Sequence, residues 1–218
     1  MLGFSDVKAE MYGGTLEGAV KLNLEQGKVA YGCRLDLKGV DLGPFVRDTF
    51  DYRGEELVGK LGGEVVLQGI GSARRDLVGE GHLTISQGEL YRMPVLLRIL
   101  NLLQLSPPRK AAFSRASLSY YLIDEDLVVN ELNLWGRGLN IFGSGTVTRD
   151  NHLDLTLYSG LGKGRFPHIP GISDAVELVG KQLVRLRVGG TFSEPEVAVE
   201  PLSPLSAPLI GALRRLLK

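Results

Sequence analysis

The sequence predicts a mainly β fold with a few helices (α+β), in which repeated β-units form one long antiparallel sheet. The first observation is a repeat. Gly13-Gly14 and Gly62-Gly63 each open an alternating strand that leads to a second strand and then to a helical run. The second is alternation of apolar and polar residues along many segments. The third is the placement of glycine, 29 of 218 residues, mostly between those segments. Stacked units of this kind extend a single sheet.

The strands are predicted from apolar residues that recur at every second position. The polar residues between them place one face of the sheet in water, which favours antiparallel pairing. The joining turns are hairpin-sized, too short for parallel crossovers. The apolar members of the alternating segments are Leu22, Leu24, Leu35, Leu37, Leu83, Ile85, Leu132, Leu134, Leu153, Leu155 and Leu157.

Helical patterns interrupt the strands at residues 41–50, 94–105, 173–179 and 206–218. Pro44 and Pro94 suit first helical turns. The 94–105 segment has so narrow a polar stripe that most of its circumference must be covered by apolar groups. These short amphipathic helices are therefore expected to lie across one sheet face.

The last of these segments, residues 206–218, follows an extended, proline-rich linker and allows two interpretations. In the first, it is a packed C-terminal helix whose terminal cations complement the helix dipole. In the second, it is a basic amphipathic element that touches a membrane surface or another protein. The contact residues would then be Leu209, Ile210, Leu213, Arg214, Arg215 and Leu217.

Charge and cysteine content exclude several function classes. Lys plus Arg and Asp plus Glu both number 25, so no global field favours nucleic acid. Cys33 is the only cysteine, so the chain has no internal disulfide and no cysteine-based metal site. A lone cysteine in a strand pattern is expected to be buried or half-buried.

The motifs of catalysis are missing from the sequence. His82, His152 and His168 lie far apart and have no neighbouring cluster of metal ligands. The glycine-rich stretch at 160–165 lacks the Gly-Lys-Ser/Thr ending of a phosphate-binding loop, and 143–145 lacks the spacing of a nucleophile elbow. We therefore expect a protein that is not an enzyme and that has no metal, cofactor or nucleic-acid partner.

Several segments, taken in order, resemble the C-terminal region of the AsmA-like family. A strand ending in a glycine turn (residues 79–90) precedes the leucine-rich helix, and a β-meander (127–134) follows it. The pattern G-x-G-x-V at 143–147 leads to Leu153-Asp154-Leu155, and residues 188–197 resemble the closing strand pair of that family. The resemblance implies a long, curved sheet that forms a groove partly covered by short helices.

The resemblance also implies a location and a role. Members of the family are anchored in the inner membrane of diderm bacteria and project into the periplasm, and they are linked to phospholipid movement between the membranes and to outer-membrane assembly. The expected organisation is an upstream β-repeat (1–60), an AsmA-like groove domain (61–200), and a linker with a helix (201–218). The N-terminus is typical neither of a signal peptide nor of a membrane span. The chain is thus expected to be a fragment or a protein anchored elsewhere.

Two functional hypotheses follow. In the first, the apolar sheet face is only partly covered and holds phospholipid acyl chains, so the eleven apolar strand residues named above are the candidate lipid contacts. In the second, the 94–105 helix and the C-terminal helix close that face into a dry core. The protein would then be a structural or interaction scaffold of an envelope assembly without lipid cargo.

Overall fold

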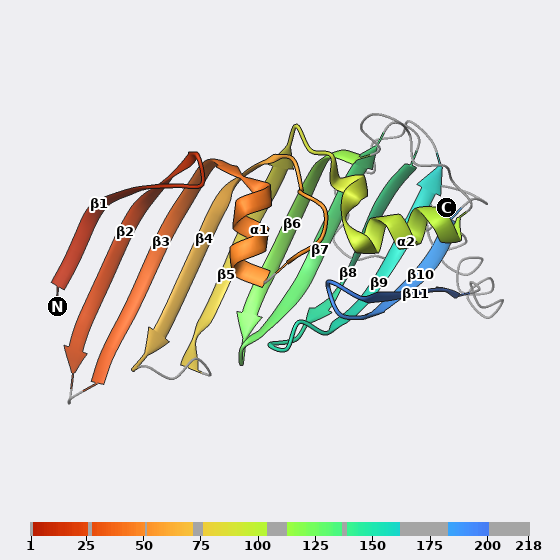
Figure 1. Cartoon of the computed structure of the whole chain (residues 1–218). Coiled ribbons are helices and arrows are strands. Elements are labelled where there is room, and N and C mark those ends of the chain that lie inside the picture. The colour runs from red at the N-terminus through yellow and green to blue at the C-terminus, as the bar shows by residue number, and fades with distance from the viewer. Residues whose placement is uncertain are drawn as a thin grey trace, which may run out of the picture.

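Eleven strands lie side by side in the same order as in the chain, and each pairs antiparallel with the next (Figure 1). The computed structural model describes residues 2–25, 28–50, 52–71, 76–103, 113–136, 139–161 and 183–200. The strands are β1 (Leu2–Met11), β2 (Gly14–Glu25), β3 (Lys28–Asp41), β4 (Lys60–Ile70), β5 (Val78–Ser86), β6 (Phe113–Ile123), β7 (Asp126–Gly136), β8 (Leu139–Val147), β9 (Leu153–Leu161), β10 (Leu183–Gly190) and β11 (Pro195–Glu200). This architecture confirms the predicted fold class.

Both described α-helices come from connections at one edge of the sheet. Helix α1 (Leu42–Phe50) joins β3 to β4, while the 3₁₀ turn η2 (Leu90–Arg92) and helix α2 (Pro94–Leu102) lie between β5 and β6. The β2–β3, β4–β5 and β6–β7 hairpins turn at the opposite edge, which we call the hairpin rim. The predicted repeat is therefore a hairpin followed by a helix, and in each copy the helix begins at the same edge of the sheet.

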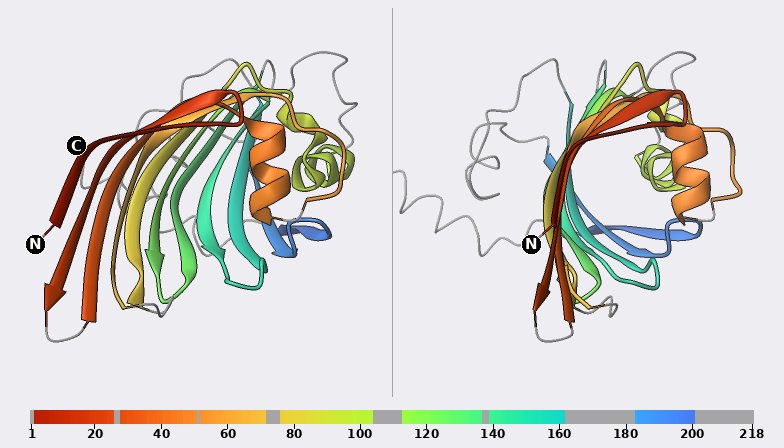
Figure 2. Two further views of the ribbon diagram at one scale, coloured as in Figure 1. Left: turned by 60° about the vertical axis from the view of Figure 1, so that its left-hand side comes forward. Right: turned by 90° about the vertical axis from the view of Figure 1, so that its left-hand side faces the viewer.

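The sheet is curved, and α1 and α2 lie on its concave side (Figure 2). The side chains of α1 and α2 share one buried cluster with residues of β6 to β10. Phe113, Leu90, Ile99 and Leu186 are completely buried in this cluster. The core is thus a layer between the helices and the concave face of the C-terminal half of the sheet.

The helix predictions agree with the structure at their start and differ at one end. Helix α1 occupies the predicted 41–50 segment, and α2 begins at Pro94 as expected. Helix α2 ends at Leu102 instead of residue 105, because Leu103 adopts a non-helical backbone (φ −81°, ψ 4°). The predicted helices at 173–179 and 206–218 lie outside the described residues. Strands β3 and β4 pair across the expected boundary at residue 60, so the sheet is continuous there.

The buried face of α2 gives a direct stability prediction. Replacing completely buried Ile99 with Ala removes apolar contacts and leaves a cavity, which destabilises a protein by about 2–5 kcal/mol. Leu102 lies on the same helix but is exposed, so Leu102→Ala should change the free energy of unfolding by less than about 1 kcal/mol. Urea denaturation followed by circular dichroism measures both. Equal losses for the two variants would contradict the packing described above.

Candidate functional site

All eleven apolar residues predicted from the alternation lie on the concave face. The register shows this directly, because Leu35 pairs with Val65, Leu83 with Leu118, and both Leu155 and Leu157 with β10 residues of the same face. Four bulges, in β1, β3, β6 and β7, shift the pairing without turning the apolar residues to the convex face. The alternation therefore identified the correct face along the whole sheet.

Coverage differs between the two halves of this face. Leu134, Leu153, Leu155 and Leu157 are buried beneath the helices, and they belong to the core described above. Leu22, Leu35, Leu83, Ile85 and Leu132 are half-buried, and Leu24 is exposed over 65% of its surface. The candidate lipid contacts therefore divide into a buried C-terminal set and a more open set toward the N-terminus, while Leu37 is buried in a separate small group near α1.

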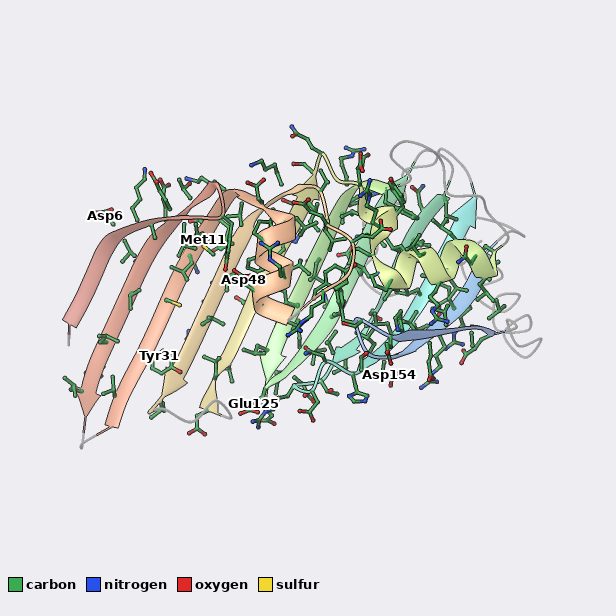
Figure 3. The ribbon with its side chains drawn as sticks, viewed as in Figure 1. Asp6, Met11, Tyr31, Asp48, Glu125 and Asp154 are labelled. Carbon is green, nitrogen blue, oxygen red and sulfur yellow. The ribbon has the colours of Figure 1, made fainter. Side chains whose placement is uncertain are left out.

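Helix α1 marks the border between the two sets. Its Phe45 packs on a small buried group formed by Leu37, Val40 and Leu61. Tyr12, in the β1–β2 turn, contacts the Phe45 ring edge-on at 6.3 Å and donates a hydrogen bond to Asp48 Oδ2 at 3.0 Å. In Figure 3, Met11 lies near α1, whereas Tyr31 lies on the half of β3 nearer the hairpin rim, away from both helices.

A row of apolar residues crosses the uncovered part of the sheet. Each residue pairs with the next through the register, and we call this row the apolar lane: Val20, Cys33, Leu67, Gly79, Leu122 and Leu127. All six are half-buried. With strands about 4.8 Å apart, the lane is about 24 Å long from β2 to β7. Leu22 and Leu35 flank it.

The concave face of the described strands carries no charged residue. Its polar side-chain atoms belong to Tyr31, Cys33, Tyr120 and Ser159. The sequence analysis missed both tyrosines, although extending the period-two pattern upstream from Leu35 would have included Tyr31. An uncharged surface of this kind can hold apolar groups without desolvating an ion.

The two tyrosine rings lie flat over glycines of the next strand. A Cβ atom added to Gly69 would come within 2.5 Å of the Tyr31 ring, and one added to Gly81 within 2.6 Å of the Tyr120 hydroxyl. A larger residue opposite either ring would therefore displace the tyrosine side chain. Burial raises the pKa of Tyr120 above its usual value, so this hydroxyl stays neutral.

The convex face of the same strands is charged and held by cross-strand ion pairs. Glu17 pairs with Lys8 and Lys38, and Arg187 pairs with Asp154 at 3.2 Å. Phe142 and Tyr158 are an exception, because they stack at 5.4 Å on this face and are buried. The ion pairs are exposed, so each contributes little to stability, but together they distinguish the polar face from the apolar one.

A shallow depression of about 290 Å³ on the convex face contains a contact between a histidine and a serine. His82 Nδ1 lies 3.0 Å from Ser119 Oγ. Glu64 is opposite His82 in the register, but its Oε1 pairs with Arg34 Nε at 3.1 Å. Among the described residues, no three His, Cys, Asp or Glu side chains are arranged to hold a metal ion.

The proposed membrane or partner contacts at Leu209, Ile210, Leu213, Arg214, Arg215 and Leu217 lie outside the described residues. Within the described part, neither helix is long and apolar enough to cross a membrane.

The neutral hydroxyl of Tyr120 predicts a pH dependence of stability. The pKa of Tyr120 is higher in the folded chain than in the unfolded chain. The contribution of its neutral hydroxyl to the free energy of unfolding is therefore complete below about pH 10 and is lost as the pH rises further. We expect the free energy of unfolding to fall less steeply between about pH 9 and pH 11 in Tyr120→Phe than in the wild type. Urea unfolding at several pH values measures this. Tyr121→Phe, at an exposed position, is the matched control and should follow the wild type.

Comparison of the chain with protein-family models, with curated proteins and with solved structures gives no match.

Proposed function

We propose that this chain is a non-enzymatic module that binds phospholipid acyl chains along the apolar lane. The observation that carries the proposal is the absence of charge from the concave face of all described strands, combined with incomplete coverage of its N-terminal half. An uncovered apolar face without convergent polar groups suits a ligand that is itself apolar and is recognised by burial.

The energetics of the lane favour a long hydrocarbon chain over a compact ligand. Each methylene group transferred from water to an apolar surface contributes about 0.8 kcal/mol. The lane is about 24 Å long, comparable to an extended acyl chain. Val20, Leu67 and Leu122 are half-buried, so a bound chain would remove further apolar surface from water.

The headgroup of such a lipid would stay in solvent. No cation on the concave face of the described strands is available to pair with a phosphate, and the Tyr120 hydroxyl is neutral. Binding would therefore distinguish lipids by their acyl chains and not by their headgroups. Movement along the lane would be passive sliding, because no charged side chain of the described concave face would hold the lipid at one point.

The resemblance to the AsmA-like family extends this proposal to a place in the cell. A module of this kind would lie on the periplasmic side of the inner membrane in a diderm bacterium. It would conduct phospholipid between the inner and outer membranes, and so contribute to outer-membrane homeostasis.

A second candidate function is a scaffold with a closed core. The observation in its favour is the C-terminal half, where Leu155, Leu157 and Leu186 are buried in one cluster with residues of both helices. If the N-terminal half also bound no lipid, the sheet would serve as a rigid interaction module of an envelope assembly.

Substitutions at adjacent residues on opposite faces separate the two functions. Leu67→Glu places a carboxylate in the middle of the lane, whereas Val66→Glu places one on the polar convex face, and both positions are half-buried. With a dansyl-labelled fatty acid as the probe, we expect Leu67→Glu to weaken binding at least tenfold, or ~1.4 kcal/mol. Val66→Glu should bind as the wild type does.

Both variants must first show the circular dichroism spectrum of the wild type. Failure of the folded wild type to bind the fatty acid, and to carry lipid in native mass spectrometry, would eliminate the lane proposal and favour the scaffold. Equal weakening by both substitutions would indicate a general loss of structure and would also count against the lane.

A further inference from the structure

Exposed apolar side chains are concentrated at the hairpin rim. Nine large apolar residues are exposed in the described part of the chain, and six of them lie at or near the ends of the β2–β3, β4–β5 and β6–β7 hairpins. We call these six the rim cluster: Leu24, Val29, Ile70, Val78, Tyr121 and Ile123. Ile70 and Ile123 are 53% and 50% exposed at the last residues of their strands.

The antiparallel order brings these residues to one edge. Leu24 pairs with Val29, Gln68 with Val78, and Ile123 with Asp126, each within the last two pairs of its hairpin. The three hairpins are consecutive in the sheet, and the ends of their strands lie along the lower edge in Figure 1. Glu125, in the β6–β7 turn, marks this edge in Figure 3. The rim cluster therefore comprises residues at the ends of five neighbouring strands, β2 to β6, at one edge of the sheet.

The rim cluster occupies both faces of the sheet. Leu24 and Val29 belong to the concave face, whereas Val78, Tyr121 and Ile123 belong to the convex face. A protein that packs on a sheet covers one face, but an apolar fluid phase surrounds an edge from both sides. We propose that the hairpin rim is a lipid-surface contact, with the six side chains of the rim cluster immersed in the interface of a membrane.

The charges near the rim select no particular headgroup. Asp76 and Asp124 are exposed there, and Glu125 pairs with Arg149 at 2.6 Å. Arg74 and Arg75 directly precede Asp76 in the sequence, so acidic and basic residues both occur in this part of the chain. The apolar side chains of the rim cluster therefore carry the proposed contact. Tyr121 presents an apolar ring with a polar end, which is typical of side chains at a membrane interface.

This contact goes beyond acyl-chain binding and can be tested separately from it. The triple variant Ile70→Thr, Val78→Thr and Ile123→Thr removes three exposed convex-face side chains while keeping β-branched residues in the strands. The matched control, Val58→Thr, Leu102→Gln and Val199→Thr, removes three exposed apolar side chains away from the rim. Flotation of the full chain with phosphatidylcholine vesicles is the assay.

We expect the wild type and the control to float and the rim variant to bind at least tenfold more weakly. Three results would overturn the proposal: no flotation of the wild type, undiminished flotation of the rim variant, or binding only to vesicles that contain phosphatidylglycerol. The last result would show that binding depends on cations and not on the apolar side chains of the rim cluster. Capture of a protein partner by the rim in the absence of vesicle binding would also reject a lipid surface.

A local probe shows whether the rim itself enters the interface. Val78→Cys in a Cys33→Ser background carries an environment-sensitive fluorophore, and Glu196→Cys on exposed β11 carries it in the control. Vesicles should shift the emission to shorter wavelength at position 78 and leave position 196 unchanged. An equal shift of the emission at the two positions on addition of vesicles would reject immersion of the rim. The rim variant should still bind the dansyl-labelled fatty acid in solution, so failure of the rim and failure of the lane are distinguishable.

Discussion

The constraint on which this structure depends is the two-residue period maintained through eleven consecutive antiparallel strands. A slip of one residue in any pair would move a row of leucines into water and a row of charges onto the concave face. The bulges at Leu37/Val40 and Val129/Leu132 absorb extra residues without such an exchange. The separation of a charged convex face from an uncharged concave face is therefore a property of the register, and no single residue establishes it.

The second constraint is the alternation of connections between two edges. In a meander, successive turns lie at opposite edges, so the helices after β3 and after β5 both arise at the same edge. Leu155 and Leu157 are buried in one cluster with residues of α1, of α2 and of the segment after α1, including Tyr52. Phe45 of α1 also packs on the group around Leu37. Within the part of the chain that the structure describes, these elements leave the residues of the apolar lane half-buried.

The sequence was sufficient for the fold class and for the face on which each leucine lies. It could not separate Leu35 from Leu155, because both alternate with polar residues and only Leu155 belongs to the buried cluster that the helices share. The close approach of Tyr31 to Gly69 could not be predicted from the sequence either. It depends on the β3–β4 register, which no local sequence pattern specifies. Alternation is a local property of the chain, whereas coverage and close approach depend on residues far apart in the sequence.

The lane and the rim are related by the geometry of the strands. From Leu24 at the rim to Leu16 beside the helix edge, β2 rises about 26 Å, and the lane residue Val20 lies midway. Leu24 and Leu22 continue the concave face from the rim toward the lane without a charged residue between them on that face. A rim immersed in an interface would thus place the lane just outside the bilayer and the helices farthest from it. An acyl chain could then pass from membrane to lane over apolar side chains, with its headgroup in water throughout.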